Sequence, residues 1–321
     1  MTTMAHPPRA LPGHQRGAAL LTAMIIVTLI ATLAASMVWQ QWRAVQVEAA
    51  ERARTQAEWI LSGALDWAKL ILREDMKTGK ATALTEPWAV PLAEARLSTF
   101  LAADKDNNTE DGPEAFLSGS ITDVQGRYNL NSLFDDTVTS TPNTKDEVPK
   151  LERLCAALGV DSSVAGRIVK GMSEARAGTA NAPLEPTRVS QLTWLGIDAA
   201  SVAALEPYVV ILPKAQGPTP VNINTAPREV LQAVLSGDAG TAEWILQVRQ
   251  RTPFANVTKV QTQAPGLNLA KVGVKSDFFE VRGRLRLADR ILEERSLVRR
   301  VAPIPVVLER ERISSRESSG S

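Results

Sequence analysis

The feature that most limits how this chain can fold is an uncharged apolar run near its N-terminus. Residues 18–38 contain no Asp, Glu, Lys or Arg, and with Trp39 the run reaches 22 residues. As a helix, this run would be about 33 Å long, which matches the hydrocarbon thickness of a bilayer. Trp39 and Trp42, followed by Arg43, are typical of a membrane interface. We therefore expect residues 18–39 to cross a membrane once.

The leader, residues 1–17, sets the expected orientation of this span. It carries Arg9 and Arg16 and no acidic residue. Because positively charged flanks stay in the cytoplasm, we expect a single-pass protein of the inner membrane with its body in the periplasm. A removed secretory signal is an alternative, since small residues occur at 34–36, but the run exceeds the usual core of about 7–15 residues. A plain uncleaved anchor is a second alternative.

The segment after the span continues the helical pattern. No proline occurs between Ala18 and Met76. Over residues 40–76, small or apolar residues recur every three or four positions, as in an amphipathic helix. These positions are Ala49, Ala53, Ala57, Ile60, Ala64, Ala68 and Ile71. The pattern predicts one continuous helix, with residues 18–39 in lipid and residues 40–76 on a globular domain.

The junction between leader and span carries a family resemblance. A short basic leader ending in Arg16-Gly17 before a long half-membrane helix resembles the type IV pilin-like proteins. That resemblance implies cleavage between Gly17 and Ala18 by a prepilin peptidase, and N-methylation of Ala18. Most such proteins have glutamate at the fifth mature position, where this chain has Thr22. Thr22 is either a tolerated membrane residue or the mark of a subunit that cannot pair with a neighbour's amine.

Two further features resemble one branch of that class, the minor pseudopilin K family of the type II secretion system. One is the missing glutamate, which that family lacks as a rule. The other is residues 123–131, DVQGRYNLN, which look like a segment of the family. The resemblance implies a complex with minor pseudopilins I and J and other pseudopilins. It also implies a role in capping the pseudopilus tip and promoting its assembly, for export of folded proteins from the periplasm.

The remaining sequence predicts an α+β, pilin-like fold. A long N-terminal helix packs on an antiparallel sheet, and an all-helical domain is inserted. The turn at Gln125-Gly126 suggests a hairpin, residues 209–213 a strand, and the alternation over 276–308 further strands. Apolar spacing predicts insert helices at 151–159, 162–172, 188–196 and 200–207. We assign residues 77–134 and 209–312 to the pilin-like domain, 135–208 to the insert, and 313–321 to a disordered tail.

Within the pilin-like domain, residues 222–266 resemble a helix–hairpin–helix lobe, with Thr225 as a helix N-cap. This lobe raises the alternative function, a membrane-tethered DNA-binding protein. Such hairpins offer backbone amides to a phosphate, yet here Asp238 and Glu243 lie at the turn. Arg249 and Arg251 follow only a full helix later. We therefore expect no nucleic-acid partner.

Calcium is the one candidate cofactor. Asp104, Asp106, Asn108 and Glu110 alternate as oxygen ligands would in a calcium loop, although the pattern lacks the glycine and final glutamate of an EF-hand. The resemblance implies calcium in the helical domain, bound by acids after the first insert helix. The matching region, residues 171–178, offers only Glu174. A solvated acidic loop at 104–111 is the favoured alternative.

Catalysis is not expected. Both histidines, His6 and His14, lie in the leader, and Cys155 is the only cysteine. The body therefore lacks His-based acid–base chemistry and an intrachain disulfide. Adjacent carboxylates such as Glu293-Glu294 are not placed in a cleft by any pattern, and we expect no small-molecule substrate. The arginine-rich stretch 282–300 is either a solvated sheet face or a docking surface for an acidic neighbour.

Overall fold

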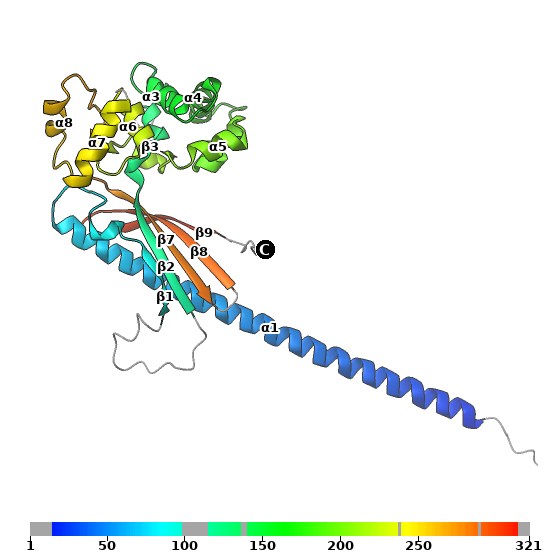
Figure 1. The fold of residues 1–321 in the computed structure, drawn as a ribbon. Coiled ribbons are helices and arrows are strands. Elements are labelled where there is room, and N and C mark those ends of the chain that lie inside the picture. Colours follow the sequence, from blue (N-terminus) through cyan, green and yellow to red (C-terminus); the bar gives the residue numbers. More distant parts are fainter. Residues whose placement is uncertain (1–14, 98–114, 136–139, 237–238, 288–289, 314–321) are drawn as a thin grey trace, which may run out of the picture. The chain divides into compact units, whose positions relative to one another are not determined.

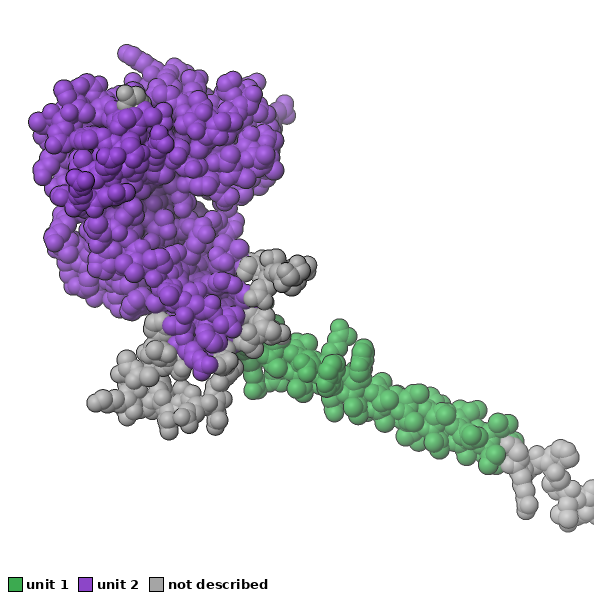
Figure 2. All heavy atoms as spheres, viewed as in Figure 1, with its two compact units in different colours: residues 1–59 green, residues 60–321 purple. Residues whose placement is uncertain are grey.

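The computed structural model describes residues 15–97, 115–135, 140–236, 239–287 and 290–313. The chain divides into two units, residues 1–59 and residues 60–321 (Figure 2). Helix α1 (Gln15–Lys77) contributes its first part to the first unit and its residues from Ile60 onward to the second. The helix is unbroken throughout, which confirms the prediction of one continuous helix over residues 18–76.

The second unit contains a five-stranded antiparallel sheet in the order β1-β2-β7-β8-β9. The strands are β1 (Leu92–Arg96), β2 (Ala115–Asp123), β7 (Phe278–Leu287), β8 (Arg290–Arg299) and β9 (Val306–Ile313). β2 pairs with β7 along its whole length, from Ala115↔Leu287 to Asp123↔Phe279. The alternation in residues 276–308 therefore predicted strands correctly, and the mixed α+β fold is confirmed.

One face of this sheet packs on the end of α1. Leu65, Ala68 and Leu72 of α1 share a core with Phe279, Val281 and Val298 of the sheet. The core is closed by Trp88 in the 3₁₀ helix η1 (Pro87–Ala89), whose ring meets Phe279 edge-on with centroids 5.2 Å apart. Burying each leucine, valine or phenylalanine side chain of this core contributes roughly 1.5–3 kcal/mol.

The buried face of α1 differs in part from the predicted stripe. Leu61, Leu65, Ala68 and Leu72 are buried in the second unit, whereas Ala64 is only half-buried. The spacing was helical as expected, but Leu61, Leu65 and Leu72 join Ala68 on the buried face, because leucines remove more apolar area from water than alanines do.

The remaining helices gather at one end of the sheet (Figure 1). They are α3 (Val148–Ala157), α4 (Ser162–Ala177), α5 (Ala199–Leu205), α6 (Arg228–Val234), α7 (Ala239–Arg251) and α8 (Thr258–Gln263). Short elements connect them: η2 (Val124–Gly126), β3 (Tyr128–Asn129), η3 (Leu130–Leu133), η4 (Val189–Leu195), β4 (Val209–Val210), η5 (Lys214–Gln216), β5 (Val221–Asn222) and β6 (Val272–Gly273). We call residues 128–273 the head, and residues 60–127 with 274–313 the body.

The head has one hydrophobic core, and this corrects the predicted domain division. Side chains of the predicted insert, such as Leu154 and Ile168, share that core with Val230 and Ile245 of the 222–266 lobe. Arg153 of α3 also donates a hydrogen bond of 2.9 Å to the carbonyl of Ala233 at the end of α6. The lobe therefore belongs with the helical insert and not with the pilin-like domain, because its apolar face is covered by α3.

Three local predictions are also corrected. The turn at Gln125-Gly126 does not make a hairpin, since Tyr128 pairs in parallel with Val209 of β4. Pro227, not Thr225, occupies the N-cap of α6, because the Thr225 hydroxyl donates to Asp123 instead. Ile313, assigned to the tail, ends β9, and residues 314–321 lie outside the described residues.

Candidate assembly sites

The N-terminal part of α1 contains the predicted processing and assembly residues. The helix begins at Gln15, so Gly17 and Ala18 lie within its first turn. The Thr22 hydroxyl donates to the backbone carbonyls of Ala18 at 3.1 Å and Ala19 at 2.9 Å. A satisfied hydroxyl is tolerated in lipid, whereas an unpaired polar group there is costly. The position of the usual pilin glutamate thus carries no charge and no free polar group.

The same helix has the composition of a membrane span. Among the described residues, one helix is long and apolar enough to cross a bilayer, with a window of mean hydropathy 2.4. None of that window is buried, and residues such as Leu20, Ile30 and Trp39 are more than half exposed. Exposed apolar surface of this extent requires lipid or partner helices around it.

The calcium candidates are not brought together among the described residues. Asp104, Asp106, Asn108 and Glu110 lie outside those residues. Glu174 forms an ion pair of 3.8 Å with Lys170, one turn away on α4. Within the described ranges, no three His, Cys, Asp or Glu side chains lie close enough to hold a metal ion.

An arginine that the sequence analysis did not single out lies close to Glu174. Arg176 stacks over the ring of Phe134 at 3.9 Å and its side chain is 1% exposed. It donates 2.6 Å to Asn131 Oδ1 and forms an ion pair of 3.2 Å with Glu185. A buried guanidinium thereby joins α4 to η3 and to the loop that carries Glu185, in the region where the resemblance implied a metal. In the sequence, this role of Arg176 is indicated only by its position at the end of a predicted helix, beside a loop with few acidic residues.

Arg249, the first arginine after the predicted DNA-binding turn, stabilises the fold. Arg249 Nη1 donates 2.7 Å to the carbonyls of both Ile223 and Ala226. Burial lowers the pKa of Arg249 to about 10. The side chain of Arg249 therefore binds the turn before α6 and is not available to a phosphate. Residues 237–238 of the predicted DNA-binding turn lie outside the described residues.

Cys155 is a core residue of the head. It is fully buried, and burial raises the pKa of its thiol to about 11. Thiolate is the reactive form, so this cysteine is chemically inert at neutral pH.

The chain passes between body and head at residues 124–127 and 274–277, and a buried polar network fixes the two crossings. We call this network the junction. Asp123 Oδ2 accepts hydrogen bonds from Ser276 Oγ at 2.6 Å, Thr225 Oγ1 at 2.6 Å and Asn222 Nδ2 at 3.0 Å. Burial raises the pKa of the Asp123 carboxyl, although these donors act in the opposite direction. Asp123 begins the segment DVQGRYNLN, but no pattern in the sequence pointed to these partners.

Two more contacts complete the junction. Gln125 accepts a hydrogen bond from the amide of Asp277 at 2.6 Å and donates one to the carbonyl of Pro220 at 3.1 Å. Arg300 donates to Thr82 Oγ1 at 2.9 Å and is ion-paired with Asp75, near the end of α1. A Cβ at Gly126 would lie 3.1 Å from Thr225 Oγ1, which is closer than most side-chain contacts, so glycine favours this close approach. Because the buried donors and acceptors are mutually satisfied, the junction specifies one arrangement of the two crossings.

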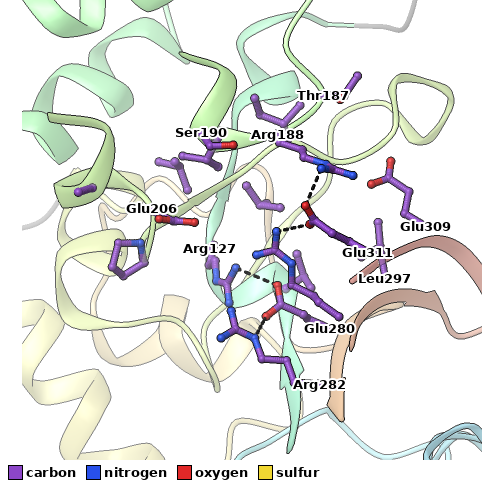
Figure 3. Close-up of a pocket in the computed structure, with 18 residues that line it drawn as sticks. Arg127, Thr187, Arg188, Ser190, Glu206, Glu280, Arg282, Leu297, Glu309 and Glu311 are labelled. Carbon is purple, nitrogen blue, oxygen red and sulfur yellow. Dashed lines mark hydrogen bonds and ion pairs between the residues drawn. The ribbon is translucent and has the colours of Figure 1, made fainter. Parts of the chain in front are cut away.

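A second polar site is a cleft of about 530 Å³ between the head and the outer face of the sheet (Figure 3). Arg127 and Arg282 both contact Glu280, at 3.5 Å and 2.6 Å. On the opposite side, Glu311 of β9 accepts from Arg295 and from Arg188, each at 2.6 Å. Within the stretch 282–300, ion pairs within the chain hold Arg282, Arg286, Arg295 and Arg300, which favours the solvated-face alternative over a free basic surface.

Comparison with known proteins identifies the family. The family model described as "Type II secretion system (T2SS), protein K" matches residues 221–282. Over 312 residues the chain is 28% identical to "Type II secretion system protein K" of Pseudomonas aeruginosa, covering 86% of each chain. It is 30% identical over 279 residues to the protein of the same name from Klebsiella pneumoniae, covering 78% of this chain and 80% of that one. The chain belongs to the type II secretion system protein K family.

Membership of the protein K family makes the chain a minor pseudopilin of the type II secretion system, a component of protein secretion at the cell envelope. Its fold matches a chain in the crystal structure of the GspK-GspI-GspJ complex from enterotoxigenic Escherichia coli, with a TM-score of 0.63 and 22% sequence identity. That match covers 83% of this chain and 99% of the other. The segment that fits the protein K family model, residues 221–282, contains Asn222, Thr225 and Ser276 of the junction.

Proposed function

We propose that this protein K family member caps the tip of the pseudopilus and promotes its assembly, for export of folded proteins from the periplasm. The leader is removed between Gly17 and Ala18 by a prepilin peptidase, and Ala18 is N-methylated. The mature protein crosses the inner membrane once, with its body and head in the periplasm. It acts by shape and charge and not as an enzyme, and it binds neither nucleic acid nor a small-molecule substrate.

The observation that carries the tip position is the head. It is a helical mass with its own core, inserted through two adjacent crossings at one end of a pilin-like sheet (Figure 1). A subunit stacking beyond this end would meet the head, so the head suits the first position in a fibre. Thr22 supports the same position, because it provides no carboxylate for the amine of a subunit ahead.

The proposed partners are minor pseudopilins I and J and the other pseudopilins. The structural neighbour described above was solved in a complex with GspI and GspJ, which supports the same assembly for this chain. The exposed apolar helix supports contact with partner helices within the membrane.

Co-purification tests this proposal. The full chain, tagged after residue 321, is expressed in cells with a complete secretion system and extracted in mild detergent. Minor pseudopilins I and J are expected to elute with it, and not with a tagged single-span membrane protein unrelated to secretion. Elution without either pseudopilin would contradict the proposal. Salt-sensitive DNA binding in a gel-shift at low salt would instead favour the DNA-binding alternative.

A further inference from the structure

The head is attached to the body by two kinds of contact with opposite physical character. On one side is the junction, where Asp123 and Asn222 are 4% and 0% exposed. On the other side is the cleft, whose lining includes Arg188 and Glu311 (Figure 3). Arg188 of the head and Glu311 of the body form an ion pair of 2.6 Å. Its two side chains are 42% and 28% exposed.

The two sides respond differently to water and salt. A buried hydrogen-bond network stays closed because breaking it leaves polar groups without partners. An exposed ion pair is weak and is screened by salt. Glu311 also has a second partner, Arg295 at 2.6 Å, so it remains paired when Arg188 leaves. Separating Arg188 from Glu311 therefore leaves no unpaired charge buried.

The apolar residues at the bottom of the cleft form the point about which the head can turn on the body. Val124, Leu212 and Phe278 form a small buried cluster between the crossings and the head, and Leu297 packs against it. Val124 and Leu297 also line the cleft. This apolar cluster adjoins the junction, since Val124 follows Asp123 in the chain. Arg188 lies in the loop before η4 and Glu311 in β9.

From this arrangement we propose that the Arg188–Glu311 ion pair is a latch that holds the cleft shut, and that the head tilts about the junction when the latch opens. Opening further exposes two partly buried, ion-paired arginines, Arg127 at the crossing and Arg295 on the outer face of the sheet. The head then adopts more than one angle on the body without unfolding of either core. The latch does not depend on the tip role, since it concerns only contacts within the chain.

Hydrogen–deuterium exchange on the full chain in detergent tests the latch. Arg188→Ala is expected to raise exchange in residues 187–190 and 309–311 together, by up to about fivefold, the most that an exposed pair of this kind contributes. Raising NaCl from about 0.05 M to about 1 M is expected to do the same in the native chain and to add nothing in the variant. Exchange in residues 123–125 and 222–225 of the junction stays unchanged.

Two controls separate the latch from a general loss of stability. Lys170→Ala removes an exposed ion pair within α4 and is expected to leave both cleft segments unchanged. In an Arg188→Ala/Glu311→Gln cycle, the double variant is expected to exchange no faster than the faster single variant. The latch is wrong if Arg188→Ala and high salt leave both segments unchanged, or if only residues 187–190 respond, because that result indicates local fraying.

Discussion

Asn222 Nδ2 lies 3.0 Å from Asp123 Oδ2, although the two residues are 99 positions apart in the sequence. Asn222 belongs to the head and Asp123 ends a strand of the body, so this contact ties the two parts at the point where the chain crosses between them. Asn222 Nδ2 also donates to the carbonyl of Thr82 at 3.1 Å and lies 2.9 Å from Ser276 Oγ. The attachment of the head to the body thus depends on a few fully buried polar side chains.

Asn222→Ala is expected to lower the free energy of unfolding by about 2–3 kcal/mol, because buried acceptors of the junction lose their donor. Denaturant unfolding of the full chain in detergent, followed by tryptophan fluorescence, measures this change. The matched control is Asn268→Ala, which removes an exposed side chain that accepts a hydrogen bond from the nearby amide of Ala270 and is expected to cost less than about 0.5 kcal/mol. Equal effects of the two variants would show that the junction contributes no more than a surface loop.

The junction also predicts a pH dependence of stability. Burial raises the pKa of Asp123 above its ordinary value, so the folded chain holds this proton more tightly than the unfolded chain. The contribution of Asp123 is therefore largest below about pH 4 and falls as the pH rises through the raised folded value. The stability of the native chain relative to Asp123→Asn is expected to fall in that window, measured by denaturant unfolding at a series of pH values. A difference that is flat or rises with pH would contradict this assignment.

Much of this fold was predictable from the sequence because its signals are local. The uncharged run 18–38, the absence of proline to Met76 and the alternation in 276–308 predicted the helix and the strands. The junction was not predictable, because Asp123, Asn222 and Ser276 meet only after the two crossings come together. The lobe 222–266 was assigned to the wrong part for a related reason: its periodicity shows that it has an apolar face, but not that α3 covers it.

Removing divalent cations is expected to leave the melting temperature of the protein unchanged. Arg176 already places a buried positive charge among Asn131, Phe134 and Glu185, and Glu174 is paired with Lys170. Scanning calorimetry with EDTA and with excess calcium measures this.

A fall in melting temperature with EDTA would contradict that expectation. Two variants would then locate the ion. Loss of the effect in Glu174→Gln would place calcium in the head, and loss in Asp104→Asn/Asp106→Asn would place it in the acidic loop.

Thr22→Glu is expected to weaken the restriction of the chain to the fibre tip. The variant supplies the carboxylate that most pilin-like subunits use to bind a neighbour's amine, so it allows incorporation behind another subunit. The ratio of this chain to the major pseudopilin in sheared fibres, measured by quantitative mass spectrometry, is expected to rise several-fold. Thr22→Val lacks the carboxylate and is expected to keep the native ratio. Equal ratios in the Glu and Val variants would remove Thr22 from the account.

The mass of the mature N-terminus decides whether this chain is a processed fibre subunit. Intact-protein and peptide mass spectrometry are applied to the native chain and to Gly17→Ala, each expressed with and without prepilin peptidase. The account predicts that the native chain begins at N-methylated Ala18 only when the peptidase is present, and that Gly17→Ala retains its leader. A native chain that begins at Met1, or that is trimmed near Ser36, would contradict it.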